Sequence, residues 1–236
     1  MLKITNLTKD YGSKKAIDSI NLEVKKGEIF GFIGHNGAGK TTTIKSIVGI
    51  QSFDSGSILI DGVDILKDDL KCKKMIAYIP DNPDIYENMK GIDYLNFIAD
   101  MYEVDENLRE NLIDKYAKKF EIYENLNEPI SSYSHGMKQK LVIISALIHE
   151  PKLLILDEPF VGLDPKASFA VKEIMKELTK SGTSIFFSSH VLEVVEKLCD
   201  RVGIIKNGKI LKVGTVDEIK GDSSLEEVFL EMTENE

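Results

Sequence analysis

The stretch "FIGHNGAGKTTTIKSIVG", residues 32–49, decides the fold of this chain. An apolar segment stops at a glycine-rich turn, and a lysine with three threonines then leads into apolar residues at helical spacing. Within it, "GHNGAGKT" at Gly34–Thr41 fits the pattern G-x-x-x-x-G-K-[ST], which joins a buried strand to a helix and binds phosphate. The pattern predicts an α/β fold that holds a nucleotide triphosphate.

The residue types in this loop suit a triphosphate with its metal ion. Glycines let backbone N–H groups approach phosphate oxygens in a concave nest. Lys40 would place its charge on the β and γ phosphates, and Thr41 would offer a hydroxyl to Mg²⁺ at the positive end of the helix. The predicted ATP-binding residues of the loop are Gly34, His35, Asn36, Gly37, Ala38, Gly39, Lys40, Thr41 and Thr42. An ordinary glycine-rich turn before a helix is the alternative, which the full eight-residue match disfavours.

Composition limits the class of protein. A length of 236 residues suits one domain, or one domain with a subdomain. The net charge of -9 argues against a basic face for nucleic acid, so we expect no nucleic-acid partner. Cys72 and Cys199 are the only cysteines, which indicates a reducing compartment. The start shows no secretory signal, and apolar stretches such as Leu141–Ile148 are too short for a bilayer, so we expect a chain that does not cross the membrane unaided.

The first 80 residues have strand-like patterns around the loop. Period-two alternation at Leu2–Thr8 and Ala16–Val24 predicts an antiparallel hairpin, which feeds a buried strand at Ile29–Ile33. We expect a helix at Lys40–Ile50 and strands at Gly56–Gly62 and Met75–Ile79.

The pattern of apolar residues changes from strand-like to helical between Asp81 and about His149. Apolar residues recur there at helical spacing, in Tyr94–Tyr102 and Leu108–Phe120, which predicts a helical insertion. After Pro151, strands and helices alternate again, at Leu153–Leu156, Ala167–Thr179, Ser184–Phe187, Val191–Leu198, Val202–Ile205 and a last helix at Leu225–Met232, with a tight hairpin at Lys206–Lys209. Such alternation predicts a mostly parallel sheet with helices on both faces.

A second motif, "LLILDEP" at Leu153–Pro159, ends an apolar run in two carboxylates. A buried parallel strand would deliver both to the edge of the sheet where ligands bind. Asp157 is placed to hold Mg²⁺ through water, and Glu158 to act as general base on the attacking water. A solvated pair that caps a strand is the alternative.

Three further stretches make the pattern specific. They are "LTKDYG" at Leu7–Gly12, "YSHGMKQK" at Tyr133–Lys140 and "SSH" at Ser188–His190. With the two motifs above, their order and spacing resemble the nucleotide-binding subunit of ABC (ATP-binding cassette) transporters, from Leu2 to about Val213. The resemblance implies an ATPase with the P-loop NTPase fold of this family, in which a mixed-sheet core carries an N-terminal antiparallel β-subdomain and a helical insertion.

The resemblance assigns a signature motif, usually LSGGQ, to "YSHGM". Tyr133, His135 and Met137 replace the usual Leu, Gly and Gln, whereas Ser134 and Gly136 are retained. The retained pair matches the residues that contact the γ-phosphate.

Three other residues take roles from the resemblance. Tyr11 matches the aromatic that stacks on adenine, with a packed hairpin tyrosine as the alternative. Asp164 in "GLDP" matches the acid of the D-loop. His190 matches the switch histidine on the γ-phosphate, with a hydrogen-bonded histidine at a strand end as the alternative.

Asp81 departs from the family pattern. Most members have a glutamine after the strand that this chain ends in "MIAYIP". A carboxylate there can bind Mg²⁺ through water, but it adds negative charge beside the phosphates and cannot donate a hydrogen bond. We therefore expect Thr41, Asp157 and Asp81 around the metal, with altered coupling to a partner.

A second subunit follows from the chemistry of phosphoryl transfer. Charge develops on the γ-phosphate oxygens, and many NTPases stabilise it with an arginine. The only arginines, Arg109 and Arg201, adjoin none of the motifs. The resemblance implies that a second subunit, identical or not, supplies Ser134 in a head-to-tail dimer that ATP closes and hydrolysis opens.

The resemblance also implies an organisation and partners. Residues 1–236 would form one ABC ATPase domain, with a nucleotide-binding core at 1–80 and 150–213, a helical subdomain at about 81–149 and a short C-terminal tail at 214–236. Separately encoded transmembrane permease subunits would dock near Ile85, Tyr86 and Met89, unless these residues form insertion core. The chain would be cytoplasmic, peripheral on the inner membrane face, in an export-type system.

Two other classes share the phosphate loop. A soluble ABC ATPase acting on DNA or ribosomes would carry long coiled coils or a second cassette, and this sequence has neither. A small-molecule kinase would have an acceptor pocket and no signature helix, which the stretch Ser134–Gly136 disfavours.

Overall fold

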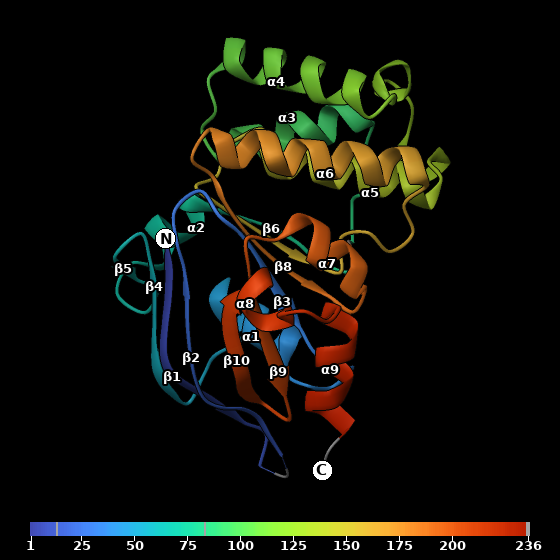
Figure 1. Ribbon diagram of the computed structural model, residues 1–236. Helices are drawn as coiled ribbons and strands as arrows, with labels where there is room; N and C mark the ends of the chain where they lie inside the picture. Colours follow the sequence, from blue (N-terminus) through green and yellow to red (C-terminus); the bar gives the residue numbers. More distant parts are fainter. Residues whose placement is uncertain (13, 83, 235–236) are drawn as a thin grey trace.

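The computed structural model describes residues 1–12, 14–82 and 84–234 of the chain (Figure 1). Its strands are β1 (Leu2–Asp10), β2 (Lys15–Val24), β3 (Ile29–Ile33), β4 (Ser55–Ile60), β5 (Val63–Asp64), β6 (Ile76–Ile79), β7 (Leu153–Asp157), β8 (Ser184–Ser189), β9 (Arg201–Lys206) and β10 (Lys209–Thr215). Its α-helices are α1 (Lys40–Ile47), α2 (Asp69–Met75), α3 (Gly91–Met101), α4 (Glu106–Lys119), α5 (His135–Leu147), α6 (Pro165–Lys180), α7 (Leu192–Leu198), α8 (Val216–Lys220) and α9 (Leu225–Glu234). Two 3₁₀ turns, η1 (Tyr123–Asn125) and η2 (Ile130–Ser132), precede α5.

The strands form two sheets. The larger has the order β10-β9-β3-β8-β7-β6, in which the neighbours from β9 to β6 are parallel and β10 is antiparallel to β9. The smaller has the antiparallel order β2-β1-β4-β5. This arrangement confirms the mixed sheet and the N-terminal antiparallel sheet expected from the sequence.

Side chains of the large sheet alternate between two cores. On β3, Phe30 and Phe32 pack with α1 and the antiparallel sheet, whereas Ile29 and Ile33 pack with the helices of the other face. Successive side chains of a strand point to opposite faces, so a strand that is buried on both sides reads as a continuous apolar run. The large sheet is therefore the middle layer of the molecule, and α3 to α6 lie above it in Figure 1.

Most predicted elements are present with boundaries shifted by a few residues, and β5 and α8 were not predicted. Two differences concern α1 and α2. Helix α1 ends at Ile47 instead of Ile50, because Gly49 takes a positive φ of 75°. Helix α2 was not predicted, and Met75, which was expected in a strand, is its last residue. Seven residues are too few to show a clear helical period, although the Asp68 side chain accepts a hydrogen bond from the Lys71 N–H as an N-cap.

The segment expected to be a helical insertion contains α3, α4 and α5, which pack against the core below them. The C-terminal residues also join this core, because α8 and α9 fold back and bury Leu225 and Phe229. The division of the chain into core, helical subdomain and tail stays a prediction. Among the described residues, no helix combines the length and the apolarity needed to cross a bilayer.

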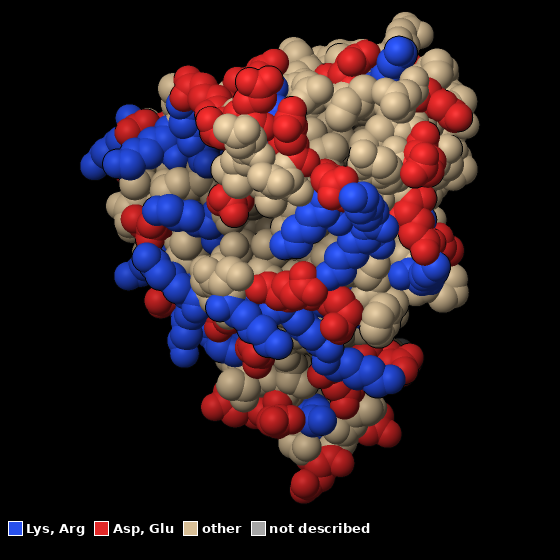
Figure 2. All heavy atoms as spheres, turned by 90° about the horizontal axis from the view of Figure 1, so that it is seen from above, with Lys and Arg blue, Asp and Glu red and all other residues tan. Residues whose placement is uncertain are grey.

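Charged side chains are mixed on the surface. Figure 2 shows acidic and basic residues interspersed over the face seen from above. Many pair across elements, as Lys119 does with Glu177 and Lys74 with Glu103.

Candidate active site

The polar motifs follow neighbouring strands. Strands β3, β8, β7 and β6 lie side by side in parallel, and their carboxyl ends meet at one edge of the sheet. The phosphate loop follows β3, His190 follows β8, Glu158 follows β7, and Asp81 comes soon after β6. Ligands of open α/β sheets bind at this edge.

A cavity of about 230 Å³ opens at this edge. It is lined by Lys14, Ala16, His35, Asn36, Gly37, Gly39, Lys40, Thr41, Thr42, Asp81, Asp157 and Glu158. The structure therefore brings most of the predicted loop residues together with three of the four predicted carboxylates, Asp81, Asp157 and Glu158, but not with Asp164.

Close backbone packing and a lysine hydrogen bond fix the conformation of the phosphate loop. Gly39 caps α1 at a φ of 113°, and a Cβ there would lie 2.4 Å from the Ala16 carbonyl oxygen, so only glycine fits. Lys40 is buried, and its Nζ donates a hydrogen bond to the Gly34 carbonyl oxygen at 2.7 Å. The lysine charge is thus fixed at the first turn of α1, where the positive helix end also lies.

Ser188 orders the two carboxylates that end β7. Its Oγ donates to Asp157 Oδ1 at 2.5 Å and accepts from the Glu158 N–H at 3.1 Å. Asp157 is only 2% exposed, so this hydroxyl helps to compensate the burial of a charge. The register that pairs Asp157 with Ser188 places the two groups side by side.

Glu158 lies between a lysine and a histidine. Its Oε1 is 3.7 Å from Lys40 Nζ, and its Oε2 is 2.9 Å from His190 Nδ1 and accepts from the His190 N–H at 3.3 Å. The Glu158 backbone has a φ of 49°, a left-handed conformation that is unfavourable for glutamate. The contacts with Lys40, His190 and Ser188 hold Glu158 in this conformation.

The oxygen donors of the cavity suit a hard divalent cation. Thr41 contributes a hydroxyl, and Asp157 and Asp81 contribute carboxylates. Mg²⁺ prefers such oxygen ligands and usually binds through one or two carboxylates together with substrate phosphates. The predicted metal ligands therefore fit the ion.

Tyr78 on β6 borders these carboxylates. Burial, followed by the charges of Asp157 and Asp81, raises the pKa of Tyr78 to about 12. The phenol therefore stays neutral at physiological pH.

The signature residues lie elsewhere. Ser134 is the exposed N-cap of α5, and its Oγ accepts a hydrogen bond from the Met137 N–H at 3.3 Å. Among the described residues, those that line the cavity include neither Ser134 nor Gly136. The sequence correctly predicted that the motif opens a helix, and the structure separates this helix end from the phosphate loop of the same chain.

The D-loop packs on the signature helix. A Cβ at Gly162, whose φ is 78°, would lie 2.7 Å from His135 Nε2, so the imidazole of His135 covers this glycine closely. Asp164 is the N-cap of α6, accepts from the Ala167 N–H at 2.8 Å, and pairs with Lys140 at 3.6 Å. Within one chain, Asp164 therefore belongs with α5 and not with the phosphate loop.

Tyr11 lies just after β1, as predicted, and its ring is more than half exposed, with Lys9 Nζ 5.5 Å from the ring centroid. Lys14 and Ala16 from the same hairpin line the cavity and were missed by the sequence reasoning. The predicted role of Tyr11 in adenine stacking was the one signal in the sequence that this hairpin borders the site. Ser188 was quoted in a motif but given no role, because its partners across the sheet depend on register.

Comparison with known proteins agrees with this geometry. The family model described as "ABC transporter" matches residues 17–161. The chain is 37% identical over 219 residues to the linearmycin resistance ATP-binding protein LnrL of Bacillus subtilis, which covers 93% of this chain and 70% of that protein. It is 38% identical over 230 residues to the lantibiotic transport ATP-binding protein SrtF of Streptococcus pyogenes, with coverage of 97% and 96%.

A solved structure described as the ATP-binding subunit of an ABC transporter superposes with a TM-score of 0.94. It is 34% identical and covers 98% of this chain and 99% of its own. The phosphate loop, the paired carboxylates and these relatives lead to one conclusion: the chain belongs to the ABC transporter family, as an ATP-binding subunit with ABC-type ATPase activity.

Proposed function

We propose that this chain hydrolyses ATP in composite sites formed by a head-to-tail pair of ATPase subunits. The proposal rests on the separation of the predicted phosphate-binding residues into two groups within one chain. Lys40, Asp157 and Glu158 share one cavity, whereas Ser134 and Gly136 lie outside it at the exposed start of α5. A second subunit that places this helix start over the cavity would complete the site.

The residues of the cavity have distinct roles in this proposal. Glu158 accepts a proton from the water that attacks the γ-phosphorus, while the bond from that phosphorus to the β–γ bridging oxygen breaks. Lys40 stabilises the phosphate charge, and His190 orients Glu158 through the contacts at Oε2. Mg²⁺, held by Thr41, Asp157 and Asp81, would neutralise charge on the phosphate oxygens when bound. Tyr11 would stack on adenine.

The partner subunit would supply the remaining donors. The Ser134 hydroxyl, the Gly136 amide and the positive end of the 13-residue helix α5 would face the γ-phosphate. Both arginines are occupied elsewhere, since Arg109 pairs with Asp100 and Arg201 with Glu28. Asp164 would approach the partner together with this helix, because it pairs with Lys140.

Complementation tests the composite site directly. Lys40→Ala disables the cavity and Ser134→Ala disables the helix start, so neither variant alone should hydrolyse ATP efficiently. An equimolar mixture should regain up to about a quarter of wild-type turnover, because half of randomly formed pairs are mixed and each keeps one intact site. A mixture no more active than the mean of its separate components would contradict the shared site.

We also propose a docking surface for a separate transmembrane subunit. Four large apolar side chains, Leu70, Tyr86, Phe97 and Met101, are 40–64% exposed. Tyr86 and Phe97 are in edge-to-face contact, Met101 lies one turn along α3, and Leu70 is on the face of α2 whose Lys74 pairs with Glu103. These residues define the α2–α3 surface, and exposed apolar groups of this kind mark interaction sites.

This surface modifies the docking hypothesis drawn from the sequence. Tyr86 is exposed as expected, whereas Ile85 and Met89 pack against the helical core. A cavity of about 230 Å³ beside Ile85 is lined by the tyrosines Tyr78, Tyr94 and Tyr102 and by His149, which stacks on Tyr102 at 3.8 Å. We propose that a cytosolic segment of the permease inserts an apolar side chain there.

Contacts of Glu87 connect the α2–α3 surface with α5. Asp81 borders the nucleotide cavity, and Glu87, six residues later, forms an ion pair with Lys138 on α5. The Glu87 carbonyl also accepts from the Ser131 N–H at 2.9 Å, just before the signature. We propose that permease binding biases the position of Ser134 through this segment.

We propose that the chain serves an export system and lies on the cytoplasmic face of the membrane through its permease. Relatives named for linearmycin resistance and lantibiotic transport support the export direction. Co-purification with a membrane partner tests the proposed docking to a permease. Met101→Glu should abolish the co-purification and leave basal ATPase activity in solution intact. The control is Leu211→Glu, since Leu211 is also an exposed apolar residue but lies on β10. Equal loss in both variants would contradict the α2–α3 surface.

A further inference from the structure

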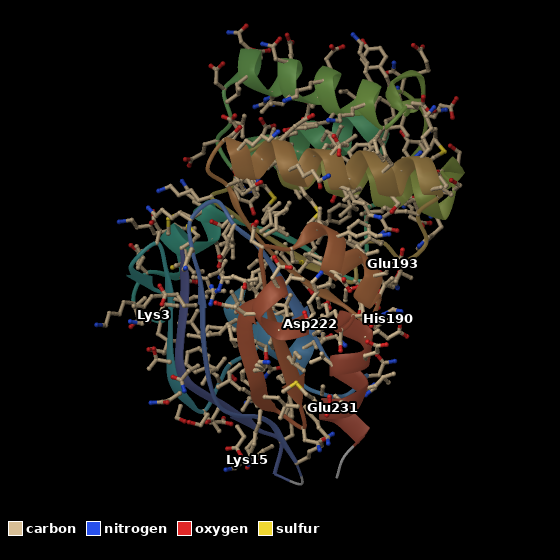
Figure 3. The ribbon with its side chains drawn as sticks, in the orientation of Figure 1. Lys3, Lys15, His190, Glu193, Asp222 and Glu231 are labelled. Carbon is tan, nitrogen blue, oxygen red and sulfur yellow. The ribbon has the colours of Figure 1, made fainter. Side chains whose placement is uncertain are left out.

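The C-terminal helix α9 reaches the phosphate loop. Figure 3 shows His190 and Glu193 on the same side of the molecule as Glu231 of α9. The helix packs against α7 and α8, and the matching family model ends at residue 161, well before it. Helix α9 therefore lies outside the family motifs but close to the nucleotide site.

One aromatic pair joins the two segments. The rings of Phe229 on α9 and His35 in the phosphate loop have centroids 4.9 Å apart and planes inclined by 56°. Phe229 is only 6% exposed, whereas His35 is exposed and lines the nucleotide cavity. Tilted rings at this distance attract each other beyond the area that they bury. The contact therefore restrains a loop residue that faces the ligand.

The helix is anchored at its start. Glu196 on α7 accepts a hydrogen bond from the Leu225 N–H at 3.1 Å and another from Lys220 Nζ at 3.3 Å. Leu225 is fully buried. Helix α7 begins two residues after His190, so the same helix that follows the switch histidine holds the base of α9. Phe229 is thus fixed relative to both the phosphate loop and the segment between β8 and α7 that carries His190.

We infer that Phe229 is a positioning residue for nucleotide binding, acting through His35. The C-terminal helix holds the second residue of the phosphate loop in place, which reduces the freedom that the loop loses when it closes around phosphate. Without the ring contact the loop would sample more conformations, and ATP would bind more weakly. The inference rests on the proposed role of this cavity as the ATP site.

The test measures ATP affinity and turnover in the full chain. Phe229→Leu keeps an apolar side chain of similar size but removes the ring, so the fold should survive, as checked by Tm. We expect the Kd for Mg-ATP and the KM to rise about two- to ten-fold, as the strength of aromatic pairs implies, with kcat changed much less. Phe229→Tyr keeps the ring and should retain wild-type affinity. Leu230→Ala, on the neighbouring exposed position, is the matched control and should bind like wild type.

A double-mutant cycle separates positioning from general stability. If the ring pair acts through His35, Phe229→Leu should weaken ATP binding in the wild-type background and have little further effect in a His35→Ala background. Equal effects of Phe229→Leu in both backgrounds, or unchanged affinity in Phe229→Leu, would overturn the inference. Failure of the wild-type chain to bind Mg-ATP at all would instead overturn the assignment of the cavity.

Discussion

The phosphate-loop edge of the large sheet and the start of α5 hold their polar groups differently. At the sheet edge the groups contact one another, as Lys40 and His190 do with Glu158 and as Ser188 does with Asp157. At the start of α5, Ser134 is exposed and accepts only the capping bond of its own helix among the described contacts. The first region is preorganised within the chain, whereas the second presents donors outward, which suits a ligand bound by another molecule.

Glu158→Gln should have the largest effect on turnover. Glutamine keeps the shape of the side chain but cannot accept the proton, so kcat should fall about 10²- to 10⁴-fold, the usual share of general-base catalysis. ATP affinity should persist, and ATP-bound dimers should accumulate in size-exclusion chromatography. Glu193→Gln, on the exposed surface of α7, is the control. A fully active, monomeric Glu158→Gln would remove the general-base assignment.

Lys40→Ala tests ATP binding at the same edge of the sheet. Loss of a buried cation that faces phosphate should weaken ATP binding at least about 30-fold, as truncating one partner of a buried charge pair does. Isothermal titration calorimetry measures the change, with Lys45→Ala on the exposed side of α1 as control. Unchanged affinity would contradict the phosphate cradle.

Ser134→Ala examines the other region. The cap bond to Met137 is lost, and so is the hydroxyl proposed to reach the partner's ATP. We expect turnover to fall about 10²- to 10³-fold, since donors to transition-state charge contribute on this scale, whereas ATP affinity of the isolated chain stays close to wild type. Ser132→Ala, whose hydroxyl bonds only to Pro129 among the described contacts, is the matched control. A variant with normal turnover would mean that the start of α5 has no part in catalysis.

Asp81→Gln tests the link between the two regions. Glutamine can donate a hydrogen bond and removes a negative charge beside the phosphates, so turnover stimulated by the permease should change several-fold, on the order of the 1–3 kcal/mol typical of allosteric coupling. Basal turnover should change less. ATPase assays with and without the reconstituted partner give both values, and equal changes in the two would remove the coupling role.

Asp164→Ala should have the smallest effect. The Ala167 N–H, followed by the Lys140 charge, holds the pKa of Asp164 below its usual value. A carboxyl whose folded pKa is depressed stabilises the fold above its unfolded pKa, and this contribution is lost as pH falls through the folded pKa. The Tm of Asp164→Ala should therefore lie about 2–4 °C below wild type at pH 7, with the gap closing below about pH 4. Asp164→Asn keeps a capping side chain and should lose less, and a gap independent of pH would contradict the ionised cap.

Local patterns predicted much of the fold because they report local physics. The loop of Gly34–Thr41 needs glycine where Gly39 caps α1, and the apolar runs of β3 and β7 reflect strands buried on both faces. The short helix α2 escaped prediction, since seven residues give no clear period. The bend of the C-terminal helices onto the core also left no local signal.

The sequence by itself determined the family and predicted which residues would carry the chemistry, because a phosphate cradle, a carboxylate pair and a capped helix each depend on neighbours along the chain. Only the tertiary structure decided which of them meet. The pairing of Asp157 with Ser188, the closure of Glu158 on Lys40 and His190, and the contact of Phe229 with His35 all arise from strand register and helix packing between distant segments. Such contacts depend on how buried surfaces fit together, and no short stretch of sequence encodes that fit.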